Sequence, residues 1–213
     1  MCGVSHICID NVAVDANGQT CTTGLGIWNS EQAEKFSGIV QLAKEEDTII
    51  GIQLTHSGRK TTLKPAPVAY ESNSPGPNER KAKAVEVISS TNVSYSETYD
   101  KPTMVQKKGL SDILKKFVEA AKRAVAAGFD MIEIQAGKGH LIHQFLSPLV
   151  NRRSDSYGGS FDGRIRFCLE VVKMVKKVLP PNVLLACQVS CGDPGPDAPW
   201  SSDDRYVFVA SLP

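Results

Sequence analysis

The sequence predicts an α/β protein built on a parallel β-sheet. Short runs rich in Ile, Val and Leu alternate with segments in which apolar residues recur every three or four positions. Such alternation of buried strands and amphipathic helices is typical of parallel βα units. Four runs have the length and composition of buried parallel strands: residues 4–9, 48–54, 131–135 and 183–190.

Three helices are expected between these strands. Asn29 or Ser30 can cap the first, whose inward face holds Phe36, Ile39, Val40 and Ala43. The second opens at Ser111 and ends at Gly128, with an apolar stripe of Ile113, Leu114, Phe117, Val118, Ala121 and Val125. The third covers residues 164–178, where the stripe is Ile165, Leu169, Val172 and Val175. The two prolines at 180–181 prevent its continuation.

Residues 60–108 interrupt this alternation. The segment is rich in Ser, Thr and Asn and contains Pro65, Pro67, Pro75, Pro77 and Pro102. Loops of this length in compact domains are uncommon and often functional. We therefore expect a long, partly ordered excursion loop over the carboxyl edge of the sheet, within a single domain that spans residues 1–213.

Charge and composition exclude several classes of partner. The 213 residues carry 24 Lys and Arg against 23 Asp and Glu, a balance that predicts neither a nucleic-acid nor a membrane-surface partner. Apolar runs stay far below the roughly 20 residues of a membrane-spanning helix. The first residues lack a secretory pattern, so a cytoplasmic location is expected. The cysteines have no CxxC spacing and the four histidines form no HExxH motif, so no metal site is predicted.

Polar residues that could carry chemistry follow the predicted strands. In parallel βα folds the reactive groups gather beyond the carboxyl ends of the strands, which selects Gln53, His56, Arg59, Gln135, Lys138, His140 and Gln188. The Gln53 amide either pairs with a heteroaromatic edge or is a satisfied core amide. His56 and Arg59 either bind an anion or cap a loop. Lys138 can hold an anionic or carbonyl oxygen and His140 can transfer a proton, although both are also compatible with a solvated loop.

Two longer motifs connect these residues to a family. Residues 51–60 read GIQLTHSGRK and residues 145–160 read FLSPLVNRRSDSYGGS. They resemble the strand motif and the signature loop of the old yellow enzyme family, the FMN-dependent NAD(P)H:flavin oxidoreductases, in its xenobiotic-reductase-like branch. The resemblance implies a TIM barrel with FMN at its C-terminal mouth. It also implies that NAD(P)H reduces the flavin, which then passes a hydride to a small activated alkene such as an α,β-unsaturated carbonyl compound.

The resemblance assigns three positions to the cofactor. Gln53 corresponds to the residue that contacts the flavin pyrimidine edge, and Asn11 occupies a flavin-side position after its strand. Gln188 stands where relatives carry an arginine near flavin N1. A neutral amide cannot offset the negative charge of reduced flavin as a guanidinium does. Flavin reduction is therefore expected to be harder in this chain.

The resemblance assigns three further positions to the substrate and the proton. Gln135 and Lys138 fall where the family has a His and a His or Asn that grip the substrate carbonyl oxygen. His140 falls on the tyrosine that donates a proton. Hydrogen-bond donors are retained at all three positions, so altered chemistry is conceivable.

The chain is expected to form only part of the barrel. A complete (β/α)8 barrel takes about 250 residues or more, whereas about four βα units, resembling strands 2 to 5, are recognised here. The expectation is an impaired or inactive ene-reductase homologue of secondary metabolism that holds FMN weakly. Its open strand edges would favour a homo-oligomer. Two alternatives stay open: a non-catalytic binding or scaffold fragment, and a flavin-independent isomerase or cyclase that uses Lys138 and His140.

Overall fold

The computed structural model describes residues 4–62, 86–190 and 212. Its centre is a sheet of four parallel strands in the spatial order β1-β2-β5-β6. The strands are β1 (His6–Ala13), β2 (Ile49–Thr55), β5 (Met131–Ala136) and β6 (Leu184–Val189). Each strand lies beside its predecessor in this sheet, and a helix connects each neighbouring pair, which is the arrangement of consecutive βα units.

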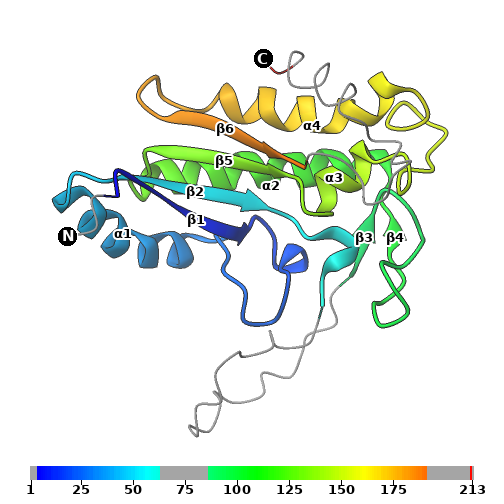
Figure 1. Ribbon diagram of the computed structural model, residues 1–213, viewed down its shortest axis with the longest axis horizontal. Coiled ribbons are helices and arrows are strands. Elements are labelled where there is room, and N and C mark those ends of the chain that lie inside the picture. Colours follow the sequence, from blue (N-terminus) through cyan, green and yellow to red (C-terminus); the bar gives the residue numbers. More distant parts are fainter. Residues whose placement is uncertain (1–3, 63–85, 191–211, 213) are drawn as a thin grey trace, which may run out of the picture.

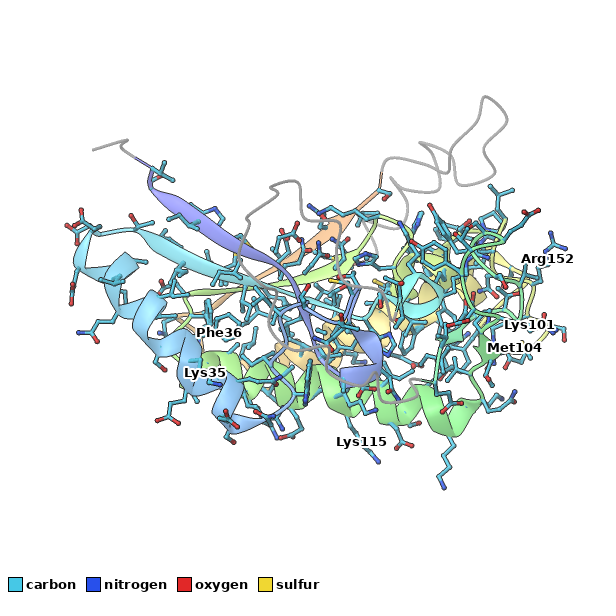
Figure 2. The ribbon with its side chains drawn as sticks, turned by 90° about the horizontal axis from the view of Figure 1, so that it is seen from below. Lys35, Phe36, Lys101, Met104, Lys115 and Arg152 are labelled. Atoms are coloured by element: carbon cyan, nitrogen blue, oxygen red, sulfur yellow. The ribbon has the colours of Figure 1, made fainter. Side chains whose placement is uncertain are left out.

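All three long helices cover the same face of the sheet (Figures 1 and 2). They are α1 (Ser30–Glu45), α2 (Lys107–Ala126) and α4 (Phe161–Lys176). A doubly wound sheet would carry helices on both faces, whereas a barrel keeps them on the outside. The architecture is therefore a sector of a βα barrel, and the fold predicted from the sequence is confirmed.

The hydrophobic core lies between the sheet and these helices. Alternate strand residues point outward, and Ile52, Leu54, Ile132 and Ile134 are all completely buried there. Helix α2 adds Phe117, which is also fully buried. The other face of the sheet, which corresponds to the barrel interior, carries the polar side chains of the middle strands. The core thus fixes which residues face the mouth.

The helix boundaries differ from the prediction at two starts. Helix α2 begins at Lys107, and Ser111 lies inside it with its hydroxyl bonded to the Lys107 carbonyl at 3.3 Å. Helix α4 begins at Phe161 because the Ser160 hydroxyl accepts a bond from the Gly163 amide at 3.2 Å. Helix α1 has the expected cap, Asn29, in a reciprocal capping box with Gln32. Among its inward residues, Ile39 was predicted wrongly, since it is 51% exposed beside the buried stripe.

Strand β1 is longer than the predicted residues 4–9. Its pairing with β2 shifts between Ile9 and Val12, and the strand then continues to Ala13. Asn11 lies in this irregularity with a left-handed backbone, φ 55°, which Asn tolerates better than most residues. The polar pair Asp10–Asn11 looks like a strand end in the sequence but forms a bulge in the structure.

The long segment 60–108 is partly described. Its residues 63–85 lie outside the described residues. The remainder holds a pair of parallel two-residue strands, β3 (Ile88–Ser89) and β4 (Thr103–Met104), and the first residues of α2. Short helical segments complete the fold: η1 (Ala16–Gly18), η2 (Gly58–Lys60) and α3 (Leu141–Leu146). The last two flank the mouth of the sheet: η2 contains Arg59, and His140 is the N-cap residue of α3.

Replacing Gly163 by alanine is expected to destabilise the fold by roughly 1–3 kcal/mol. A Cβ at this position would lie 2.2 Å from the Gly158 backbone oxygen, so the signature loop or α4 would have to move. Gly38→Ala in α1 is the matched control, because a Cβ there meets nothing within 4 Å; it should stabilise by roughly 0.5–1 kcal/mol. Urea unfolding of both variants measures the difference. Equal gains in stability at the two sites would contradict the close packing at Gly163.

Candidate active site

Three glutamine side chains meet on the inner face of the sheet. The Gln135 amide nitrogen donates to Gln53 Oε1 at 2.7 Å and to Gln188 Oε1 at 2.6 Å. Gln53 Nε2 in turn donates to Glu133 Oε1 at 2.5 Å. Strand register places these residues together, because Gln53 pairs with Glu133 and Gln135 pairs with Gln188. The structure therefore brings the three predicted amides into one network.

This network decides which amide can face a ligand. An amide nitrogen has two N–H donors, and Gln135 uses both on its neighbours, while its oxygen accepts from the Gly137 amide at 2.7 Å. Gln135 therefore has no donor left for a substrate oxygen in this arrangement. Gln188 is half-buried, and its Nε2 has no hydrogen-bond partner among the residues that the structure describes. Gln188 is the amide that can donate to a ligand.

Lys138 lies at the rim of this site. Its backbone is left-handed, φ 55°, and its ammonium forms an ion pair with Asp10 Oδ2 at 2.9 Å. The pair connects the loop after β5 to strand β1 across the end of β2. Lys60, from η2, donates to the Lys138 carbonyl at 2.9 Å. The rim of the site therefore holds the ammonium groups of Lys60 and Lys138 and the carboxylate of Asp10.

His140 lies deeper, at the start of α3. Its Nδ1 is 2.8 Å from Thr55 Oγ1 at the end of β2, and the residue is only 5% exposed. Burial, helped by the charges of Lys60 and Lys138 and opposed by Asp10, lowers the pKa of His140 to about 4. The imidazole is thus neutral at pH 7 and has one N–H to donate. The proton-transfer role of His140 stays a prediction.

Asn11 has an unsatisfied side-chain oxygen. Its Oδ1 is buried and has no hydrogen-bond partner within the described residues. Buried carbonyl oxygens in proteins are nearly always bonded, so a donor supplied by a ligand fits this atom. Asn11 lies in the bulge of β1, close to the carboxyl end of the strand, and its assignment to the cofactor stays a prediction.

Structural partners occupy two further histidines, His56 and His143, and Arg59. His56 Nδ1 accepts from the Gly58 amide at 3.1 Å, and His143 Nδ1 accepts from the Gly139 amide at 3.1 Å. Arg59 donates to the carbonyls of Val93 and Ser94, which is the loop-capping alternative. In the described part of the chain, no three potential ligands gather into a metal site. No described helix is both long and apolar enough to cross a bilayer.

Sequence reasoning missed three residues of the mouth: Asp10, Lys60 and Glu133. Asp10 follows the predicted first strand directly, so the carboxyl-end rule would have selected it. Lys60 closes the motif at residues 51–60. Glu133 alternates with Gln135 along β5, and a period of two would have placed it on the inner face.

The fold is a sector of a βα barrel, and its inner face presents three hydrogen-bonded glutamine amides. The sequence profile of the NADH:flavin oxidoreductase / NADH oxidase family matches residues 1–203. An NADPH dehydrogenase of Clostridium acetobutylicum is 37% identical over 191 residues, covering 90% of this chain and 51% of that protein. An NADH:flavin oxidoreductase of Gibberella zeae is 33% identical over 186 residues, covering 87% of this chain and 45% of that protein. The chain belongs to the NADH:flavin oxidoreductase / NADH oxidase family.

Solved structures agree with this membership. Morphinone reductase superposes with a TM-score of 0.74 at 25% identity, over 87% of this chain and 50% of that chain. Histamine dehydrogenase from Rhizobium sp. 4-9 superposes with a TM-score of 0.81 at 24% identity, over 99% of this chain and 29% of that chain, and shows the fold alone. The chain thus spans about half the length of the curated relatives that it matches.

The residues present fit the uncharged edge of a flavin. The isoalloxazine pyrimidine ring offers both donors and acceptors, for which Asn11 Oδ1 and Gln188 Nε2 are chemically suitable partners. The family implies FMN and NAD(P)H as its cofactors. Gln188 is a neutral amide and brings no positive charge to an anionic reduced flavin; its correspondence to a family arginine stays a prediction.

Proposed function

We propose that the chain carries the flavin-edge and substrate-facing residues of an NAD(P)H:flavin oxidoreductase that reduces an activated alkene such as an α,β-unsaturated carbonyl compound. The observation that supports this most is the convergence of the Gln53–Gln135–Gln188 network with Lys138 and His140 at the carboxyl ends of neighbouring strands. Membership of the family supports it further. A cytoplasmic location accords with NAD(P)H as reductant and is part of the proposal.

Each residue has a role that its contacts allow. Asn11 Oδ1 and Gln188 Nε2 hold the pyrimidine edge, and Gln53 keeps the network in register through Glu133. Bound FMN would supply the hydride-transfer chemistry. The Lys138 ammonium polarises the substrate oxygen, which favours negative charge developing there. His140, held by Thr55, donates a hydrogen bond beside it.

The same contacts support a weaker enzyme than its relatives. Gln188 brings no charge to the reduced cofactor, and Gln135 has both donors engaged. A neutral imidazole is a much poorer acid than an imidazolium, so His140 with its pKa lowered to about 4 releases a proton reluctantly at pH 7. Slow alkene reduction follows from these substitutions.

Gln188→Arg is expected to tighten FMN binding about tenfold, because a charge-assisted hydrogen bond exceeds a neutral one by about 1 kcal/mol or more. Gln135 keeps Gln53 Oε1 as an acceptor, so the network survives the change. Titration of FMN fluorescence measures the dissociation constant. Gln188→Met is the matched control and should bind FMN more weakly than the unsubstituted chain.

The test also separates the alternatives. Unchanged or weaker FMN binding by the Gln188→Arg variant would contradict the placement of residue 188 at the flavin. Isomerisation of a carbonyl compound without FMN, abolished by Lys138→Ala, would instead favour the flavin-independent enzyme.

A further inference from the structure

Two lysines meet at the loop after β5, and only one of them has a carboxylate partner among the described residues. The Lys60 ammonium is fixed on this loop by the Lys138 carbonyl at 2.9 Å and lies 4.8 Å from the centre of the Tyr95 ring. Its stem packs on Gly139, where a Cβ would lie 3.3 Å from the Lys60 Cδ. Neither a carbonyl nor a ring cancels a charge, and no carboxylate of the described residues pairs with Lys60.

The second ammonium, on Lys138, has an exchangeable partner. Its ion pair with Asp10 is about half exposed on both sides, 44% and 51%. Exposed pairs of this kind stabilise by only about 0–1 kcal/mol, so an anionic group of a ligand can replace Asp10 at little cost. Lys60 is then the ammonium without a carboxylate partner among the described residues, since the Glu133 carboxylate on β5 is bonded to the Gln53 amide.

His140 lies at the end of the same loop, buried beside Thr55. Burial first, and then the charges of Lys60 and Lys138, lower its pKa, while Asp10 opposes them. The neutral imidazole adds no charge to the subsite but can donate a hydrogen bond.

We propose that Lys60 and Lys138 form an anion subsite that binds the carboxylate of a small unsaturated substrate, with Asp10 as the resident counter-ion that the carboxylate displaces. This subsite specifies the substrate class of the proposed oxidoreductase. Turnover of such a substrate rests on the proposed function, whereas its binding does not. In this proposal Lys60 binds the substrate carboxylate, and Asp10 pairs with Lys138 until that carboxylate replaces it.

A charged and a neutral probe of equal shape test the subsite directly. Crotonate is an unsaturated carboxylate, and crotonamide is its uncharged counterpart. Isothermal titration at low salt should show crotonate binding about tenfold more tightly than crotonamide, with an advantage that shrinks as salt is added. Lys60→Gln should weaken crotonate about fivefold and leave crotonamide unchanged, whereas Lys138→Gln should weaken crotonate by at least as much and crotonamide to a smaller extent. Asp10→Asn should tighten crotonate.

Lys115→Gln is the matched control, since this lysine lies on α2 on the helix side of the sheet (Figure 2) and pairs with Asp112. Circular dichroism checks that every variant folds. Equal affinity for the two probes, or a crotonate affinity that Lys60→Gln leaves unchanged, would overturn the subsite. Charge-dependent binding without any reduction of crotonate would count against the oxidoreductase proposal and support the subsite alone.

Discussion

Lowering the pH from 7.5 to 4 is expected to destabilise the folded chain by about 3 kcal/mol for each of two buried histidines. Burial lowers the pKa of His56 from 6.5 to about 4, which Asp15 opposes and Lys116 assists. Burial, with Lys60 and Lys138, lowers the pKa of His140 to about the same value. The unfolded chain takes up these protons first. Stability is therefore full above pH 6.5, falls as the pH drops toward 4, and changes little below the folded pKa.

Urea unfolding between pH 7.5 and 4 measures this slope. His56→Gln and His140→Gln should each reduce the pH dependence of the unfolding free energy relative to the unsubstituted chain. Each substitution removes one group that takes up a proton more readily in the unfolded chain than in the folded one. His6→Gln, at the exposed start of β1, should keep the original slope and serves as the control. A His56→Gln variant with the original slope would show that His56 is protonated as easily in the folded chain as in the unfolded one.

Arg153→Met is expected to destabilise the fold by about 3 kcal/mol or more. The guanidinium is nearly buried and binds both carboxylate oxygens of Asp155, at 2.9 and 2.6 Å, and the Val105 carbonyl at 2.7 Å. It thereby ties the signature loop to the segment that precedes α2. Methionine fills much of the same volume but leaves Asp155 and the Val105 carbonyl without their donor.

The neighbouring residue provides the control for this substitution. Arg152 is exposed (Figure 2), and Arg152→Met should change stability by less than about 0.5 kcal/mol. Denaturant unfolding at pH 7 compares the two variants. Equal losses would mean that general charge, and not the bidentate contact, is responsible. Arg153→Lys should recover only part of the lost stability. Lysine keeps the positive charge, but an ammonium cannot bind both carboxylate oxygens as a guanidinium does.

Much of the site followed from the chain alone. Gln53, Gln135 and Gln188 were placed at one mouth because parallel strands end at the same edge, and their contacts confirm this. The apolar alternation also located the strands and the three helices to within a few residues. These features depend on local periodicity, which a single sequence contains.

The partners of those residues depend on contacts between distant segments. Lys138 meets Asp10, 128 positions away, through the left-handed backbone at Lys138 and the bulge in β1. The loss of both Gln135 donors depends on the register of three strands. Periodicity determined which residues face the mouth. Tertiary structure alone decided which of their donors and charges are already satisfied, because hydrogen bonds and ion pairs depend on distances that only the packed chain sets.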